Sequence, residues 1–200
     1  MDELEVRQRK SMNRFTIRRY SRDDVDAIYA AADESREHVA RWMGWMTPEY
    51  SKKDAEEWVS HATSSWQNEA SYEHVIVDAA TQKVIGSCGL NHLNKIDLVC
   101  NLGYWVSRSY LGRGAAVDAV LALKEFAFDS LGYARLEIVV AESNHASYRV
   151  AEKSGAVHEG IHRARLRIQG LSHPAHIFAL INPKAEQAST GKLAAHTETK

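Results

Sequence analysis

Two glycines mark a stretch of the chain that is suited to bind an anion. The segment "YWVSRSYLGRGAAVDAV", residues 104–120, places Gly112 and Gly114 between a strand-like run and a helix-like run. Neither a strand end nor a first helical turn requires glycine, so the pair indicates that a ligand approaches the backbone closely. A turn that feeds a helix exposes unpaired N–H groups, and the helix dipole adds partial positive charge. The loop is therefore predicted to bind a phosphate or, better, a pyrophosphate.

The spacing within this loop excludes the common nucleotide motifs. No third glycine completes G-x-G-x-x-G, and no Lys-Ser pair completes a P-loop. Taken alone, G-x-G is weak evidence, because a plain tight turn explains it equally well. Another phosphate carrier is favoured over a free nucleotide.

Asn144 and Ser147 are the second pair of chemical interest. They stand three residues apart at the start of the helical segment "NHASYRVAEKSG", so both side chains face the same groove. From the residues alone, Ser147 is either a helix cap or a hydroxyl directed into that groove. The ten histidines are scattered, with no H-E-x-x-H and no cysteine partner, so no metal site is predicted.

The elements that must hold these residues follow from periodicity and punctuation. They are a strand at 14–20, helices at 21–43 and 51–69, strands at 74–78, 84–93 and 98–107, a helix at 114–131, a strand at 134–140, a helix at 144–155 and a hairpin at 162–181. This order predicts an α/β (α+β) fold in one domain: a mixed, mostly antiparallel central sheet with a splayed parallel centre and helices on both faces. Leu98 to Val140 forms that parallel centre, where ligands commonly bind at strand ends.

Composition limits the class of protein further. Two hundred residues with 44% hydrophobic content fit one domain, and a net charge of -1 gives no general attraction to nucleic acid or acidic membranes. No apolar stretch approaches the ~20 residues of a membrane span, and a cytoplasmic location is expected. Cys88 and Cys100 are predicted to be buried thiols. Residues 1–13 are predicted to be a flexible N-terminus and 183–200 a disordered tail.

Longer stretches of the chain carry a family resemblance. "LGYWVSRSYLGRGAAVDAV", followed by "FAFDSLGYARLEIVVAESNHASYRVAEKSGAVHEGIHR", resembles the GNAT acetyltransferase superfamily, in the branch that contains the RimJ and RimL enzymes. The likeness runs from about Arg14 to Ile181, so residues 14–182 are predicted to form the GNAT domain. It implies an N-acetyltransferase that uses acetyl-CoA as co-substrate, without a metal. The acceptor it implies is a primary amine, on a protein N-terminus or a small molecule.

The resemblance also implies roles for single residues. The loop that holds the pyrophosphate maps onto Leu111, Gly112, Arg113, Gly114, Ala115 and Ala116. Backbone groups of Trp105 and Val106 would bind the pantetheine and thioester, and Asn144 would hold the pantetheine arm. Ser147 would lie by the sulfur and protonate the departing thiolate. The E-K-x-G…E-G signature matches Glu152, Lys153, Gly155, Glu159 and Gly160, with Lys153 predicted to bind the cofactor.

On the acceptor side the predictions rest on fewer residues. Trp42 and Trp45 resemble the tryptophans that overlie the acceptor pocket in this branch, although ordinary packing explains Trp42 equally well. His92 is a candidate for the same pocket. His74, His92 and Glu73 are candidates for the general base, and a structural role is favoured for each. The alternating Arg163, Arg165 and Arg167 fit a solvated sheet edge better than a site for an acidic acceptor.

Four positions depart from the family pattern. Arg108 and Ser109 replace the usual Pro and Gln or Arg of the loop, Asn101 replaces a common Glu, and Ala151 replaces the tyrosine that often serves as the acid. These departures leave open a protein of another class, a catalytically reduced CoA-binding sensor or protein-interaction module. They also leave the general base unassigned, and a homodimer remains compatible with the sequence.

Overall fold

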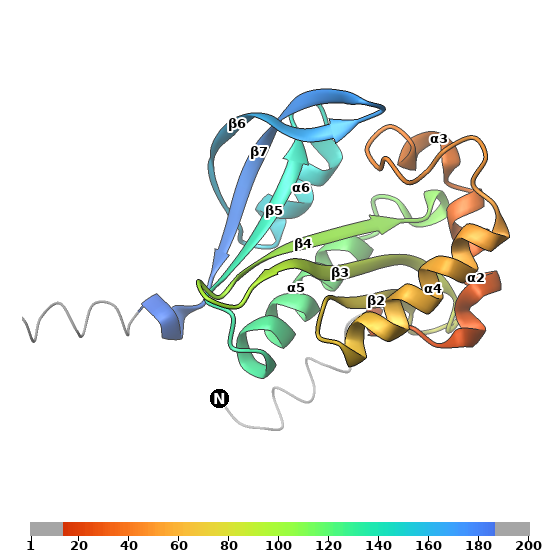
Figure 1. Ribbon diagram of the computed structural model, residues 1–200, viewed down its shortest axis with the longest axis horizontal. Helices are drawn as coiled ribbons and strands as arrows, with labels where there is room; N and C mark the ends of the chain where they lie inside the picture. Colours follow the sequence, from red (N-terminus) through yellow and green to blue (C-terminus); the bar gives the residue numbers. More distant parts are fainter. Residues whose placement is uncertain (1–13, 187–200) are drawn as a thin grey trace, which may run out of the picture.

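The structure is a computed structural model, and it describes residues 14–186 (Figure 1). The strands are β1 (Phe15–Arg19), β2 (Tyr72–Asp78), β3 (Val84–Asn94), β4 (Val99–Val106), β5 (Arg135–Ala141), β6 (Val157–Ile168) and β7 (Leu171–Ile181). The helices are η1 (Arg22–Asp24), α2 (Val25–Asp33), α3 (Arg36–Val39), α4 (Lys52–Gln67), η2 (Arg108–Tyr110), α5 (Ala115–Glu125), the π-helical η3 (Phe126–Ser130) and α6 (His145–Lys153).

Two of the helices begin at capping boxes, in which side chains satisfy free N–H groups. Ser21 and Asp24 form a capping box at η1, and Ser51 and Asp54 form another at α4. The helix predicted for residues 114–131 is present, but its last turn widens into η3. It stops at Gly132, whose φ of 75° is one that L side chains rarely adopt. Local sequence therefore sets where these helices start and end.

The seven strands form one sheet in the order β1-β2-β3-β4-β5-β7-β6. Every neighbouring pair is antiparallel except β4 and β5, which are parallel. The predicted fold class, a mixed and mostly antiparallel sheet with a parallel centre, is confirmed.

The parallel pair is short, and the sheet opens beyond it. β4 and β5 pair only over Val99–Asn101 and Arg135–Glu137, whereas β5 pairs with β7 along its whole length. β5 therefore follows β7 away from β4, and the two strands diverge visibly (Figure 1). The split leaves the edges of β4 and β5 facing one another without backbone pairing.

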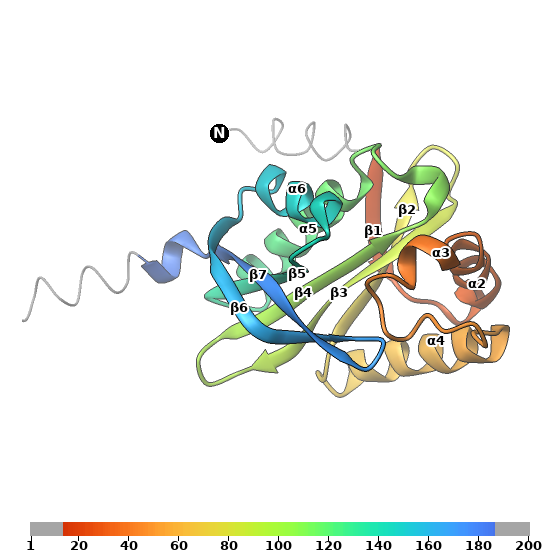
Figure 2. The same ribbon diagram turned by 90° about the horizontal axis from the view of Figure 1, so that it is seen from above.

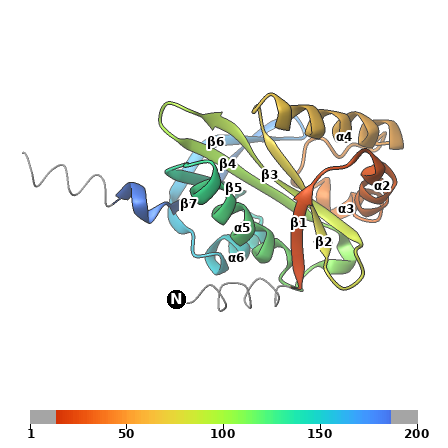
Figure 3. The same cartoon turned by 90° about the horizontal axis from the view of Figure 1, so that it is seen from below.

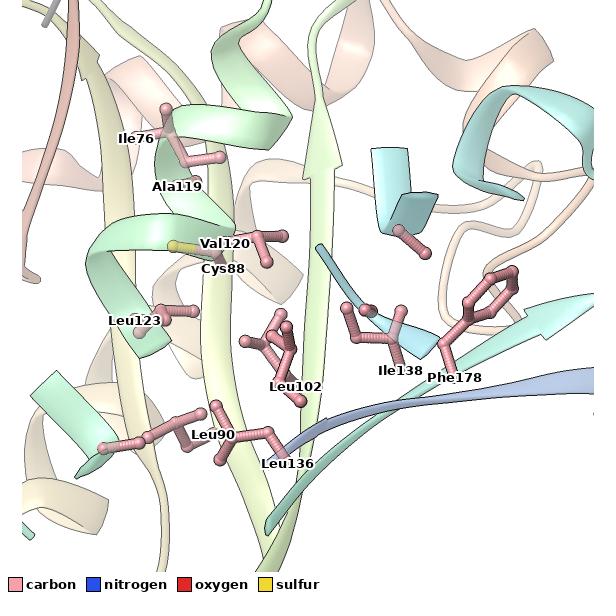
Figure 4. Close-up of a cluster of buried hydrophobic side chains, with 14 of the residues drawn as sticks. Ile76, Cys88, Leu90, Leu102, Ala119, Val120, Leu123, Leu136, Ile138 and Phe178 are labelled. Carbon is pink, nitrogen blue, oxygen red and sulfur yellow. The ribbon is translucent and has the colours of Figure 1, made fainter. Parts of the chain in front are cut away.

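Helices cover both faces of the sheet. On one face α5 and α6 pack over a core that includes Leu90, Leu102, Leu123, Ile138 and Phe178 (Figures 3 and 4). On the other face α2 and α4 bury a second core against β2 and β3. Because both cores are dry and close-packed, the sheet is held rigidly on either side of the split.

The chain ends have a limited description. Residues 183–186 form a helical turn in the region predicted as a disordered tail, with Lys184 Nζ 2.9 Å from Asp129 Oδ1. The predictions for residues 1–13 and 187–200 lie outside the described residues. Within residues 14–186, no helix has the length and apolar character needed to cross a membrane.

Candidate active site

A cavity of about 680 Å³ occupies the split in the sheet. Its walls come from β3 and β4 on one side, β5 and the start of α6 on another, and α4 with the segment after α3 on a third. The β6–β7 hairpin adds Arg165 and Leu166 to the lining. Figure 2 shows this hairpin reaching toward the segment that follows α3, where Gln169 Nε2 donates to Ala40 O at 3.5 Å. The cavity thus connects the α6 side of the sheet with the α4 side.

Ser147 meets a tyrosine at this split. The hydroxyl oxygen of Tyr104 lies 2.8 Å from Ser147 Oγ, and the same hydroxyl donates to Ser147 O at 3.2 Å. Burial raises the pKa of Tyr104 to about 12, and the contact with Ser147 offsets part of this rise. The phenol therefore stays protonated at neutral pH, and the two hydroxyls share a hydrogen bond in which either can be the donor.

The helix cap at α6 is Asn144 rather than Ser147. Asn144 Oδ1 accepts a hydrogen bond from the Ser147 backbone N–H at 3.1 Å, as an N-cap side chain does. The capping alternative for Ser147 is therefore wrong, and its hydroxyl is free of that duty. Asn144 holds the first turn of α6 in place, and so fixes where Ser147 points.

Sequence reasoning gave no role to Tyr104. Position 151, where relatives carry a tyrosine, is a fully buried alanine in the core. A phenol nevertheless reaches Ser147, from β4 instead of α6 and 43 residues earlier in the chain. The only signal for it was the Gly-Tyr-Trp run in a strand next to the parallel centre.

The glycine loop has the backbone that its sequence indicates. Gly112 and Gly114 have φ values of 71° and 91°, which only glycine adopts readily. Asp118 N bonds to Gly114 O at 3.0 Å, so the N–H groups of Ala115 and Ala116 precede the first intrahelical bond of α5. Leu111 and Arg113 are exposed beside them. A loop of this shape can bind an anion.

The residues just before the glycine loop are hydrogen-bonded to the residues that follow α2. Ser109 Oγ donates to Glu34 Oε1 at 2.8 Å, and Arg108 N donates to Ser35 Oγ at 3.0 Å. The departure at Ser109 therefore has a structural reason, since its side chain ties η2 to the end of α2. The glycine loop follows η2 directly and is held from its N-terminal side.

The backbone N–H and C=O groups of successive β4 residues point alternately toward β3 and toward the split. Ser107 N donates to Ile85 O, so by the alternation of strand groups Trp105 faces β3, while Tyr104 and Val106 face the split. This direction does not fit the backbone role predicted for Trp105. The carbonyl of Val106 accepts a hydrogen bond from His38 Nε2 at 3.1 Å, which leaves its N–H as the group free to bind pantetheine.

Aromatic residues and one carboxylate line the part of the cavity under α4, which we call the acceptor arm. The aromatic residues are Trp42, Trp45, Tyr50, Trp58 and Trp105, and the carboxylate is Glu73. The ring of Trp45 lies 5.5 Å from that of Tyr50 and 5.7 Å from that of Trp105, and 42% of the residue is exposed. His92 also contacts the cavity, from an exposed position. Their predicted roles in acceptor binding stay predictions.

The sequence predicts the β6 arginines either on a solvated sheet edge or at a site for an acidic acceptor, and the structure has features of both. β6 is an edge strand of the sheet, and Arg163, Arg165 and Arg167 are all exposed, as the edge interpretation predicts. Arg165 also lines the cavity. Its strand is irregular there, with Ala164 at a φ of 52°.

Neighbouring residues on β2 point to opposite faces of the sheet. His74 is buried against the rings of Trp66 and Phe126, and burial lowers its pKa to about 4, so its role is structural as predicted. Glu73 instead lines the cavity with only 5% of its surface exposed. Burial raises the pKa of Glu73 to about 7. The structural role that the sequence favours for Glu73 does not explain why this side chain lines the cavity.

Lys153 and Cys100 do not line the cavity, whereas Cys88 does. Lys153 is exposed in the last turn of α6. Cys88 and Cys100 are both buried and free, and burial raises the pKa of each thiol, that of Cys100 to about 12. Among residues 14–186, no group of three or more His, Cys, Asp or Glu side chains is arranged to hold a metal ion.

The fold and this split sheet define a family. The model of the acetyltransferase (GNAT) domain matches residues 14–157, and the chain belongs to that family.

Three proteins that resemble this chain are compared with it. It is 30% identical over 122 residues, 60% of this chain and 67% of the relative, to the probable N-acetyltransferase YjcK of Bacillus subtilis. The structure of RimL, a ribosomal L7/L12 α-N-protein acetyltransferase in complex with coenzyme A, matches with a TM-score of 0.78 and 19% identity over 84% of this chain and 94% of that one. The microcin C7 self-immunity acetyltransferase MccE, in complex with acetyl-CoA and AMP, matches with a TM-score of 0.78 and 18% identity over 84% and 93%. At these identities the two structures show the fold alone.

Proposed function

We propose that the protein is an N-acetyltransferase that moves the acetyl group of acetyl-CoA directly to a primary amine. The observation that carries this proposal is the Ser147–Tyr104 hydroxyl pair at the open edge between β4 and β5. A thiolate leaving group needs a proton donor, and the pair supplies one at the point where the sheet is not closed by backbone pairing.

The residues present fit acetyl-CoA. The glycine loop and the first turn of α5 offer backbone N–H groups to the pyrophosphate, with Arg113 beside them. The free N–H of Val106 and the backbone of Tyr104 face the split, where a pantetheine arm can pair with them as an added strand would. Trp105 contributes its ring to the acceptor arm.

Ser147 acts as the acid in this proposal. Its Oγ gives a proton to the sulfur as the C–S bond breaks, and the Tyr104 hydroxyl, which stays protonated, stabilises Oγ through their hydrogen bond. The rival mechanism, with a cysteine nucleophile, is disfavoured because burial keeps the thiols of Cys88 and Cys100 protonated. No covalent intermediate is needed.

The acceptor is proposed from the relatives and from the cavity. RimL is described as acetylating a protein α-amine, and another solved structure of this fold is described as a spermidine N-acetyltransferase. Both a protein N-terminus and a small amine therefore belong to the range of this fold. The acceptor arm is open to solvent at Trp45, which allows either to enter.

The test is thiol release from acetyl-CoA in the presence of pooled peptides and polyamines, alongside calorimetric binding of acetyl-CoA. Release that requires an amine supports the transferase. Tight binding of acetyl-CoA with no release for any amine supports instead the alternative, a CoA-binding sensor or protein-interaction module, which the departures at Asn101 and Ala151 favour.

A further inference from the structure

Glu73 occupies an unusual place in the sheet. It belongs to a row across three strands in which Glu73 pairs with Gly89 on β3 and Gly89 pairs with Gly103 on β4. Paired residues point to the same face, so two glycines lie beside this carboxylate in the direction of the split. The side chain is 5% exposed and lines the cavity.

Gly89 is where the carboxylate rests. A Cβ at position 89 would overlap Oε2 of Glu73, so the carboxylate lies directly over β3 and reaches toward β4. A Cβ at Gly103 would meet only Asn101 Nδ2, at 3.9 Å. The floor between the carboxylate and the split is therefore open, and its width is about one strand spacing, ~4.8 Å. An amine nitrogen fits there within hydrogen-bond reach of Glu73.

This carboxylate has no ion-pair partner among the described residues. Among residues 14–186 no Lys, Arg or His forms an ion pair with Glu73. Asn101 Nδ2 donates to Asn91 Oδ1 at 2.9 Å, and Asn91 lies beside Glu73. A buried carboxylate without a counter-charge favours a cationic partner, such as an ammonium group that enters the arm.

The titratable groups that are coupled to Glu73 or line the same cavity are Tyr20 after β1, Cys88 on β3, Asp54, Glu57 and His61 on α4, and Arg165 on β6, with His74 next to it on β2. Burial raises the pKa values of Tyr20 and Cys88 and lowers that of His74 to about 4. These three are uncharged at neutral pH. Burial raises the pKa of Glu73 itself to about 7, which suits a group that takes and releases a proton near neutrality.

We propose that Glu73 is the general base that deprotonates the acceptor amine. This rests on the proposed N-acetyltransferase function and supplies the base that it lacks. The carboxylate receives a proton from the ammonium group, and the neutral amine attacks the thioester carbonyl from the floor over Gly103. The C–N bond forms, the C–S bond breaks, and the sulfur takes the proton of Ser147. The proton then lost by the acylated nitrogen restores the hydroxyl, and Glu73 releases its proton to solvent.

The assignment accounts for one departure from the family pattern, at Asn101. Asn101 lacks the carboxylate that relatives often carry on β4, but it holds Asn91, and Asn91 adjoins Glu73. In this chain the carboxylate comes from β2, two strands from β4, and faces the same floor over Gly103. Glycine at 89 is what permits this reach.

The first test compares Glu73→Gln with wild type and with Glu56→Gln, a change on the exposed surface of α4 that the cavity does not contact. The acceptors are a peptide with a free N-terminal alanine and putrescine, with the amine pool as a reserve. Glu73→Gln is expected to lower kcat/KM for the acceptor about a hundredfold or more. Binding of acetyl-CoA, measured by calorimetry, is expected to stay unchanged in both variants.

A pH profile separates a base from a structural carboxylate. In wild type, log kcat/KM is expected to rise with pH until Glu73 is ionised, near 7, and then to level. Glu73→Gln should lose this step, whereas His61→Gln should keep it. Gly89→Ala, which displaces the carboxylate without removing it, should lower turnover as Glu73→Gln does.

The outcomes keep the two proposals apart. Wild type that acetylates an amine, together with a folded Glu73→Gln variant of equal rate and unchanged pH profile, overturns the base assignment alone. Wild type that binds acetyl-CoA but acetylates no amine in the pool overturns the transferase proposal, and the base assignment with it. Thermal melts of every variant establish that it is folded.

Discussion

At the scale of single residues, the site depends on hydroxyl and carboxylate groups whose settings differ. Asn144, not Ser147, caps α6, and the Ser147 hydroxyl shares a hydrogen bond with the Tyr104 hydroxyl. Glu73 is buried over a glycine on the other face of the sheet. An acid and a base with separate environments can act in one reaction because their proton affinities are set independently.

Replacement of Ser147 by alanine is expected to lower kcat by about a hundredfold, because the acid helps only as the C–S bond breaks. The KM for acetyl-CoA and the melting temperature should change little. Asn144→Ala is the matched variant: it loses the cap, which costs about 1 kcal/mol, and should melt lower. A Ser147→Ala variant that melts several degrees lower yet turns over normally would contradict the catalytic role.

At the scale of elements, the glycine loop, α5 and the split of β4 from β5 form one unit. The loop is tied to α2 through Ser109, and α5 packs under β4 through the main core. The positive φ angles of the glycines therefore sit between two fixed ends. A change in the loop backbone cannot be absorbed elsewhere without moving its N–H groups.

Gly114→Ala tests this unit. A Cβ there meets nothing within 4 Å, so the penalty is conformational: a φ of 91° costs an L residue of the order of 1–2 kcal/mol. Relief of that strain should shift the N–H groups, and acetyl-CoA should bind more weakly while kcat at saturation is largely kept. Gly44→Ala is the control, because its Cβ is equally unobstructed and no positive φ is involved. Equal effects in calorimetry for the two variants would refute the explanation.

At the scale of the whole molecule, the buried pair Glu73 and His74 makes stability depend on pH. The folded-state pKa of Glu73 is raised from 4.5 to about 7, so its burial destabilises the fold increasingly as pH rises through that interval. The pKa of His74 is lowered from 6.5 to about 4, so its burial destabilises the fold as pH falls through the overlapping interval. Each shift corresponds to roughly 3 kcal/mol, and the two slopes oppose each other.

In the Glu73→Gln variant, only His74 of this pair still makes the free energy of unfolding depend on pH. Relative to wild type, the variant is expected to gain stability as pH rises from 4.5 to 7, by up to about 3 kcal/mol at the upper end. Urea unfolding of both proteins across this interval measures the difference, in which contributions from other groups cancel. A difference that does not vary with pH would mean that the Glu73 carboxyl is not raised. A variant that is more stable but inactive would show a cost in stability kept for function.

The sequence by itself determined what depends on near neighbours in the chain. Capping residues, periodicity and glycines predicted the order of elements, the mixed sheet and the loop, and the family motifs predicted Ser147 as a candidate, because local backbone preferences are encoded within a few residues. Only the tertiary structure decided which distant side chains meet. Tyr104 reaches Ser147 across 43 positions, and Glu73 lies over Gly89 through strand register. Such contacts depend on pairing, on burial and on the point where β4 and β5 part, and no local pattern carries that information.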